Sequence, residues 1–388
     1  MPARPGPRPS PRRGRPARKP DKAGGRRSGI RPVPVGVAVV LLGLALAWVA
    51  RGLDRPRRLL ERAEVASRSG DRAAARLAWR EVNDSAGATA RTWLAEARLD
   101  FALHRGRDAG LALERATQLD PGGAEAWRGR IDRLRLLDRP IEALPLGLLA
   151  ARSVPPAECR SILAATTLAV LSDLPDDDAR ARLDRWIAAD GDDSDARVAR
   201  LARLAANPKG GDPDRAARIA ELSRLLDRDP GHVPAREALV AALADAGDLD
   251  RGRRALEAWP LGARDARFDR LRARWDLDYD RRPDRAEAGY RRALAASPHD
   301  WRGHYGLARA LRSLGRDGEA RAEGEAVARL RERLDPAALG PRLAADLADP
   351  DLARGAADLA RLCESAGLAT LAEAWRLEAR PRPAPGGR

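Results

Sequence analysis

A spacing of 34 residues recurs through most of this chain and limits its fold more than any other feature of the sequence. Four pairs of identical residues stand at this offset, and two further pairs stand at twice the offset. The pairs are Trp93 and Trp127, Ala109 and Ala143, Ala116 and Ala150, and Pro121 and Pro155, then Pro230 and Pro298 and also Gly247 and Gly315 at the doubled spacing. A period of about 20–50 residues is typical of solenoids, in which each unit packs only against its neighbours.

The residues inside one unit predict a pair of helices. Ala286, Tyr290 and Ala293 are four and three positions apart, so they share one face of a helix. The two alanines allow a neighbouring helix to approach closely, and Tyr290 fills the space between them. Pro298 ends the helix because it has no N–H and clashes with the preceding turn. The partner helix is expected to end at a glycine in the left-handed conformation, for which the candidates are Gly70, Gly247 and Gly315.

This pattern resembles the tetratricopeptide repeat family, which alternates large and small residues at fixed positions and places a proline near the end of each unit. In the unit that starts at residue 90, the matching residues are Trp93, Ala97, Ala109, Leu113, Ala116 and Pro121. The same register places the starts of other units at residues 56, 124, 199, 233, 267 and 301. The resemblance implies an all-α, right-handed superhelical solenoid of TPR-like helix pairs over residues 56–334, with weak units at 158–232. We expect a C-terminal helical cap at 335–380 and a disordered tail at 381–388.

The N-terminal region differs sharply in composition from the repeats. Residues 1–32 contain eleven Arg or Lys and many Pro but few apolar side chains, so we expect a disordered basic tail. Residues 33–50 then hold 18 residues without a charge. As a helix they would span roughly 27 Å, enough for a hydrocarbon core. The sequence therefore predicts a transmembrane signal anchor at 33–50.

The charge on either side of this segment predicts its orientation. The positive-inside bias favours a cytoplasmic N-terminus and a body on the extracytoplasmic (periplasmic) side of a single-pass inner membrane protein. The alternative is a cleaved signal peptide, with Ala45-Leu46-Ala47 as the small-residue cleavage site and a secreted body.

The sequence contains no arrangement of residues typical of catalysis. It lacks a nucleophile elbow, a phosphate-binding Gly loop and a metalloprotease helix, so we expect no enzyme activity and no cofactor or metal. The acidic run at 190–195 resembles the start of a calcium loop, but its twelfth position is Leu201. These aspartates more simply cap a helix that begins near residue 195. Cys159 and Cys363 are interpreted as small buried residues.

The resemblance also implies a concave face lined by the first helix of each unit. The residues carried over to this face are Arg91, Arg98, Phe101, Arg128, Arg135, Phe268, Trp275, Tyr279, Tyr305, Arg309 and Arg312. Arginine interleaved with aromatic residues suits an extended or helical peptide with acidic groups. The alternative is that these arginines are ordinary solvated positions. Arginine is abundant throughout the chain, because only three of the 72 basic residues are Lys, so arginines on one face need not mark a binding site.

The main functional hypothesis is a non-catalytic, membrane-anchored scaffold that binds another protein or peptide. A helical-repeat nucleic-acid binder is one alternative. The net charge of +15 favours it, but the tail at 1–32 supplies +10 of that charge, which argues against it for the folded body. A regulatory or accessory subunit of an envelope enzyme complex is the other alternative.

Overall fold

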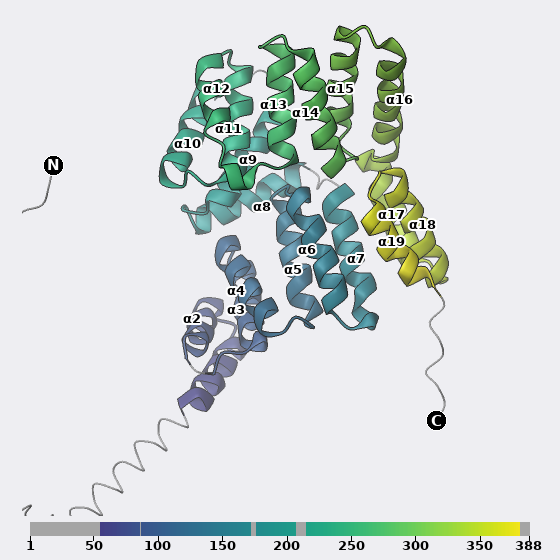
Figure 1. Ribbon diagram of the computed structural model, residues 1–388. Coiled ribbons are helices and arrows are strands. Elements are labelled where there is room, and N and C mark those ends of the chain that lie inside the picture. The colour runs from purple at the N-terminus through teal and green to yellow at the C-terminus, as the bar shows by residue number, and fades with distance from the viewer. Residues whose placement is uncertain (1–54, 86, 172–175, 207–214, 381–388) are drawn as a thin grey trace, which may run out of the picture. The chain divides into compact units, whose positions relative to one another are not determined.

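A computed structural model describes residues 55–85, 87–171, 176–206 and 215–380 (Figure 1). The described residues belong to one compact unit. The predicted basic tail at 1–32, membrane span at 33–50 and C-terminal tail at 381–388 lie outside the described residues. Among the described helices, none has the length and apolar character needed to cross a membrane.

Every regular element in the described part of the chain is helical, as the repeat pattern predicted. After a helix over residues 55–68 come α2 (Arg72–Asn83), α3 (Ala90–Ala102), α4 (Gly106–Leu119), α5 (Ala124–Leu136), α6 (Pro140–Ser153), α7 (Pro156–Leu171), α8 (Asp176–Ala189), α9 (Ser194–Ala206), α10 (Arg215–Arg228), α11 (Val233–Asp245), α12 (Leu249–Glu257), a 3₁₀ turn (Leu261–Ala263), α13 (Ala266–Asp278), α14 (Pro283–Ala296), α15 (Trp301–Ser313), α16 (Asp317–Arg333), α17 (Pro336–Ala348), α18 (Leu352–Ser365) and α19 (Ala369–Ala379).

The helix pairs follow the predicted repeat where the pattern is strong. The pairs α3–α4, α5–α6, α13–α14 and α15–α16 begin within one residue of the predicted unit starts at 90, 124, 267 and 301. Gly70, Gly247 and Gly315 have φ values of 82°, 74° and 74°, which confirms the predicted left-handed turns. These angles are accessible to glycine because it has no Cβ.

Small and large residues of the repeat pattern build the core as predicted. Ala143 and Ala150 on α6 are 0% exposed, which lets α5 and α7 pack closely against this helix. Trp127 at the start of α5 is 5% exposed. Its indole Nε1 donates a hydrogen bond of 2.8 Å to the carbonyl oxygen of Pro121, so the polar atom of this buried ring is satisfied.

The centre of the chain departs from the 34-residue period. The weak unit expected at 199 is replaced by α9, which already begins at Ser194. Helix α8 packs against α9, whereas α7 packs against α5 and α6. Because of the longer spacing in this region, α8 does not follow α7 as the next helix of a regular repeat. It lies instead beside the turn between α3 and α4, where Trp186 meets Gly106.

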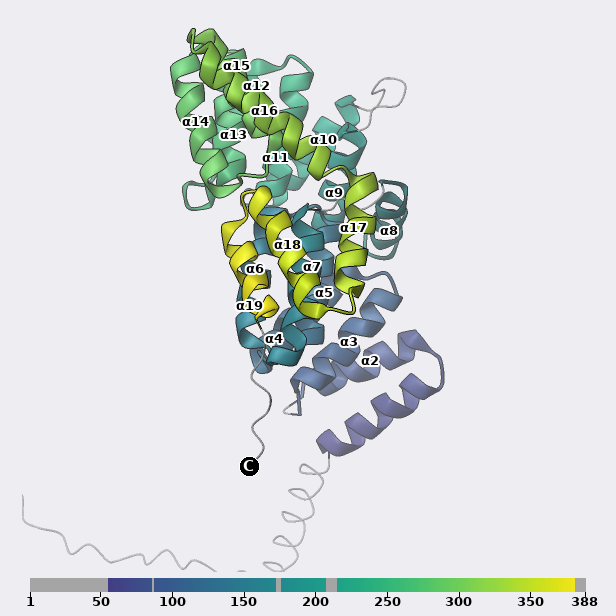
Figure 2. The same ribbon diagram turned by 90° about the vertical axis from the view of Figure 1, so that its right-hand side faces the viewer.

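The C-terminal helices, predicted to cap the last repeat, pack instead against helices of an earlier repeat. A cap covers the last repeat, but α19 packs against α7 and α6, near the middle of the chain (Figures 1 and 2). Residues of α5, α6 and α7 share one hydrophobic core with residues of α17, α18 and α19. The fully buried Trp375 of α19 is part of this core. The physical reason is that α7 has a second apolar face, which includes Leu163 and Val170.

Candidate functional site

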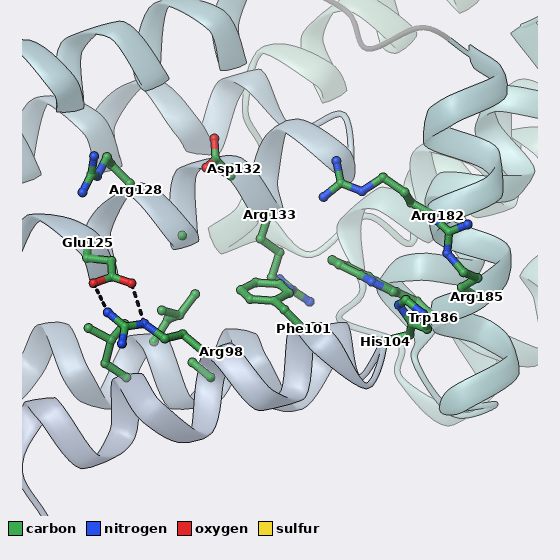
Figure 3. Close-up of a pocket in the computed structure, with 14 residues that line it drawn as sticks. Arg98, Phe101, His104, Glu125, Arg128, Asp132, Arg133, Arg182, Arg185 and Trp186 are labelled. Atoms are coloured by element: carbon green, nitrogen blue, oxygen red, sulfur yellow. Dashed lines mark hydrogen bonds and ion pairs between the residues drawn. The ribbon is translucent and has the colours of Figure 1, made fainter. Parts of the chain in front are cut away.

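A pocket of about 530 Å³ lies where α3, α5 and α8 meet (Figure 3). Its apolar surface comes from Leu94, Ala97 and Phe101 of α3, Leu113 of α4 and Trp186 of α8. The rings of Phe101 and Trp186 are in tilted contact, with 6.0 Å between their centroids. Trp186 is 3% exposed, so most of this ring belongs to the core that it shares with Leu183.

A glycine at the start of α4 allows α8 to reach this position. A Cβ atom on Gly106 would lie 2.0 Å from Cε3 of Trp186, a distance at which atoms overlap. The Gly106 carbonyl also accepts a 3.1 Å hydrogen bond from Nε of Arg133 on α5. The turn between α3 and α4 is thereby joined to both α5 and α8, and this arrangement holds the three walls of the pocket together.

One end of the pocket contains an ion pair between repeats. Nε of Arg98 donates a 2.7 Å hydrogen bond to Oε1 of Glu125, and the second nitrogen of Arg98 binds the other carboxylate oxygen (Figure 3). The hydrogen bonds from Arg98 lower the pKa of Glu125, so this carboxylate stays ionised at neutral pH. Both side chains are largely exposed, and such pairs add little to stability.

Behind the pocket, Arg133 belongs to a charged network centred on Asp195 of α9. Asp195 accepts hydrogen bonds from Arg133 at 2.8 Å and from Arg139, and it lies 3.1 Å from Nε2 of His232. Burial opposes ionisation of this carboxyl, but the bond with His232 and the charges of Arg139 and Arg133 outweigh that effect and lower its pKa. The network fixes Arg133 in place and pairs its guanidinium with a carboxylate of the protein itself.

The acidic run before α9 acts as a cap, as the sequence analysis favoured. Oδ1 of Asp193 accepts a 3.0 Å hydrogen bond from the backbone N–H of Ala196 in the first turn of α9. Asp195 instead belongs to the arginine network described above. Among the described residues, no group of three His, Cys, Asp or Glu side chains is arranged to hold a metal ion.

Three arginines of the pocket are not neutralised in this way. Arg128 lies on α5, and Arg182 and Arg185 lie on α8 (Figure 3). Within the described ranges, no side chain or carbonyl is within ion-pair or hydrogen-bond distance of their guanidinium groups. The carboxylate of Asp132 lies between Arg128 and Arg182 in the pocket lining (Figure 3). Loss of hydration raises the pKa of Asp132, and the charges of Arg135, Arg182 and Arg128 lower it less strongly. The pocket thus presents an excess of positive charge around an apolar floor, with five arginines against two carboxylates.

The structure brings together three of the predicted partner-binding residues, namely Arg98, Phe101 and Arg128, in this pocket. Arg91 and Arg135 lie on the neighbouring turns of α3 and α5 but do not line it. Their positions agree with a common face on the first helices of two units.

The remaining predicted residues lie far along the chain, on α13 and α15 or directly after α13. Trp275 of α13 is 1% exposed and shares a core with residues of α11 and α12, so burial removes it from the predicted surface. Phe268 and Tyr279 pack partly against the same core. Arg309 is paired with Asp278 at 2.8 Å. Among these residues, Tyr305, which is 52% exposed, and Arg312 are exposed, whereas Phe268, Tyr279 and Arg309 are half-buried.

Sequence reasoning missed the α8 wall of the pocket, which supplies Arg182, Arg185 and Trp186. These residues lie in the region of irregular spacing, where the repeat register assigns no inner face. One signal could have found them. Trp186 is the only aromatic residue between Trp127 and Trp259, and it is flanked by arginines one and four positions earlier.

Comparison with known proteins supports the tetratricopeptide resemblance in part of the chain. The family model described as tetratricopeptide repeat matches residues 209–274, which overlap the end of the region of weak units at 158–232. No curated protein matches this sequence.

Several solved structures are similar to this one at low sequence identity. A tetratricopeptide repeat protein from Parabacteroides merdae is 12% identical, with 66% of this chain and 98% of that chain covered and a TM-score of 0.32. Yeast Tom70 is 10% identical, with 84% and 83% covered and a TM-score of 0.31. A chain of the APC/C hetero-tetramer Cut9–Hcn1 is 14% identical, with a TM-score of 0.37. The match covers 79% of this chain and 56% of that chain.

Proposed function

We propose that this helical-repeat protein is a non-catalytic scaffold, anchored to a membrane by residues 33–50, whose repeats bind another protein on the extracytoplasmic side. The tetratricopeptide match at residues 209–274 and the helix pairs on either side of it support a protein-binding role. The observation that carries the proposal is the pocket between α3, α5 and α8, where charged groups without partners surround an apolar floor.

The charge of the pocket supports an acidic partner. Its lining contains five arginines but only two carboxylates, those of Glu125 and Asp132. Guanidinium groups recognise carboxylates through two parallel hydrogen bonds, which makes such contacts both strong and selective. A partner that brings carboxylates to Arg128, Arg182 and Arg185 would neutralise the charge that the fold leaves uncompensated.

Affinity capture with the full chain tests this proposal. The protein, solubilised in mild detergent, is used to capture partners from a membrane extract, and a triple variant with Arg128, Arg182 and Arg185 changed to Glu is compared with it. A matched control changes Arg224, Arg254 and Arg321, which are exposed and distant from the pocket, to Glu. Partners that are lost with the pocket variant and kept with the control support the proposal. Equal capture by all three proteins contradicts it.

Two further measurements separate the finer parts of the proposal. A topology reporter fused after residue 388 is expected to be active outside the cytoplasm. A reporter active in the cytoplasm would overturn the proposed orientation.

An enzyme activity that co-purifies with the captured partner, and is altered by the pocket variant, would favour the accessory-subunit alternative over a passive scaffold.

A further inference from the structure

We propose that the pocket binds a short peptide segment in which one bulky apolar side chain is flanked by carboxylates on both sides. This inference rests on the protein-binding function proposed above and assigns the chemistry of the partner. It follows from the order of chemical groups across the pocket, which is cationic at one end, apolar in the middle and cationic at the other end (Figure 3).

The middle of the pocket suits an apolar side chain. Phe101 and Leu94 are half-buried, so the fold leaves part of each apolar side chain uncovered, and Leu113, which is 2% exposed, lies beneath them. Removal of a Leu- or Phe-sized side chain from water is favourable in proportion to the apolar area that it buries. A pocket of about 530 Å³ has room for such a side chain and its immediate neighbours, but not for a folded domain.

The two ends suit carboxylates. Arg128 lies at the α5 end of the pocket, whereas Arg182 and Arg185 lie at the α8 end, on the far side of Phe101 (Figure 3). The other two arginines are less available, because Arg98 is bonded to Glu125 and Arg133 is bonded to Asp195. An incoming carboxylate therefore finds its best partners at the two ends.

Asp132 disfavours a different arrangement of the ligand. Its carboxylate lines the pocket between Arg128 and Arg182, as Figure 3 shows. A negative charge at the middle of the ligand would face Asp132 and be repelled, whereas negative charges at the ends would not. Repulsion of this kind is a common source of specificity. An uncharged central residue is thus selected by charge as well as by the apolar floor.

The aromatic pair favours a peptide over a nucleic acid. Single-stranded nucleic acids bind by stacking bases on exposed aromatic faces. Trp186 is 3% exposed and is in contact with Phe101, so it does not present an open ring face. The uncovered part of Phe101 can contact an apolar side chain of a peptide while the two rings stay in contact.

Binding of defined peptides to the full chain in detergent tests the inference. The first probe is a fluorescein-labelled peptide with a central Phe and two Glu on each side. The second replaces each Glu with Gln, and the third replaces the Phe with Gly. We expect the first probe to bind at least about tenfold more tightly than either of the others by fluorescence anisotropy, because both kinds of contact are needed. Its affinity should also fall as salt is raised.

Charge-reversed variants locate the binding site. The double variant Arg182→Glu/Arg185→Glu should weaken the first probe by about tenfold or more, whereas Arg224→Glu/Arg321→Glu, with the same change in charge, should leave its affinity within about twofold. Both pairs are exposed, and far-ultraviolet circular dichroism verifies that each variant is folded. Phe101→Ala should reduce the preference for the first probe over the Gly-containing probe.

Other outcomes overturn the inference in distinct ways. Equal affinity for the Glu and Gln peptides, or an equal effect of the two double variants, excludes the proposed charge recognition. A single-stranded RNA that binds more tightly than the first probe, with its binding lost in Arg182→Glu/Arg185→Glu, would assign the pocket to nucleic acid. If membrane partners are captured through the pocket but none of the peptides bind, the scaffold function stands and the assigned ligand chemistry is wrong.

Discussion

The indole Nε1 of Trp375 donates a 2.9 Å hydrogen bond to Oγ1 of Thr167, and so joins two residues that are 208 positions apart. Trp375 is 0% exposed. The guanidinium of Arg160 lies 5.9 Å from the centroid of its ring and donates a 2.7 Å hydrogen bond to the Leu352 carbonyl. This cluster holds α19 and the start of α18 against α7.

Trp375→Ala is expected to lower the free energy of unfolding by about 3–5 kcal/mol, because it leaves a cavity in a closed core. Thr167→Val should cost about 1–3 kcal/mol, because the indole N–H then stays buried without an acceptor. Thr167→Ser keeps the hydroxyl and serves as the control. Urea unfolding followed by circular dichroism measures these changes. Unchanged stability of Thr167→Val would show that the hydrogen bond does not contribute.

The repeat core allows a paired test of volume. Trp127→Ala should destabilise the protein by about 3–5 kcal/mol, and Ala143→Leu by about 1–3 kcal/mol, since the first creates a cavity and the second overfills a closed contact. Leu111→Ala on α4 is the control, because Leu111 is 56% exposed and should change stability by less than about 0.5 kcal/mol. Thermal unfolding measures the stability of the three variants. The same change in melting temperature for all three would contradict the assigned core.

The charged network behind the pocket predicts a loss of stability with a defined pH dependence. Asp195→Asn leaves Arg133 and Arg139 without their shared partner, so we expect a loss of about 3–5 kcal/mol at neutral pH. The pKa of Asp195 is lowered in the folded state. Its contribution is therefore present above the unfolded pKa of about 4 and is lost as the pH falls below it. Stability curves of wild type and variant should converge in acid.

Asp100 predicts the opposite pH dependence. This fully buried carboxyl has its pKa raised to about 6 by burial, although Arg76 partly opposes the shift. The folded state then keeps a proton that the unfolded state has released between about pH 4 and 6, so the contribution of Asp100 to stability increases as the pH falls through that window. Asp100→Asn should remove a gain on the order of 1–3 kcal/mol. Urea midpoints between about pH 4.5 and 7.5 measure it; parallel curves would contradict the prediction.

Gly106 links the fold to the pocket. Gly106→Ala should displace Trp186, because the added Cβ would overlap its ring, and should weaken binding of the acidic peptide as well as stability. Gly324→Ala is the matched control: it lies within α16, and an added Cβ there meets no atom within 4 Å. That change should be neutral or stabilise the helix by up to about 1 kcal/mol. Peptide affinity and melting temperature are measured for both, and equal affinities would exclude a role of Gly106 in the pocket.

The sequence was most informative where local spacing determines packing. The alternation of Ala143, Ala150 and Trp127 with turn residues predicted the pairs α3–α4, α5–α6, α13–α14 and α15–α16, since each unit mainly contacts the next one along the chain. The family resemblance placed Arg98, Phe101 and Arg128 on one face, and all three line the pocket; their role in binding stays a prediction.

Contacts between distant segments were not predictable in this way. The approach of Trp186 to Gly106 and the docking of Trp375 on Thr167 join residues that no period relates. Trp275 was assigned to a surface by its position in the unit, but the side chains of α11 and α12 bury it. In each case the contact depends on how side chains of different helices fit together, and the repeat spacing carries no information about that fit.

The return of α19 to α7 changes how the chain should come apart. An open array of repeats can fray from its last unit and unfold one unit at a time. Here the C-terminal helices cannot loosen without breaking a buried contact near the middle of the array. The repeats from α5 onward should therefore melt as one cooperative body, and deletion of the last two helices should destabilise α6 and α7 more than the neighbouring α15 and α16.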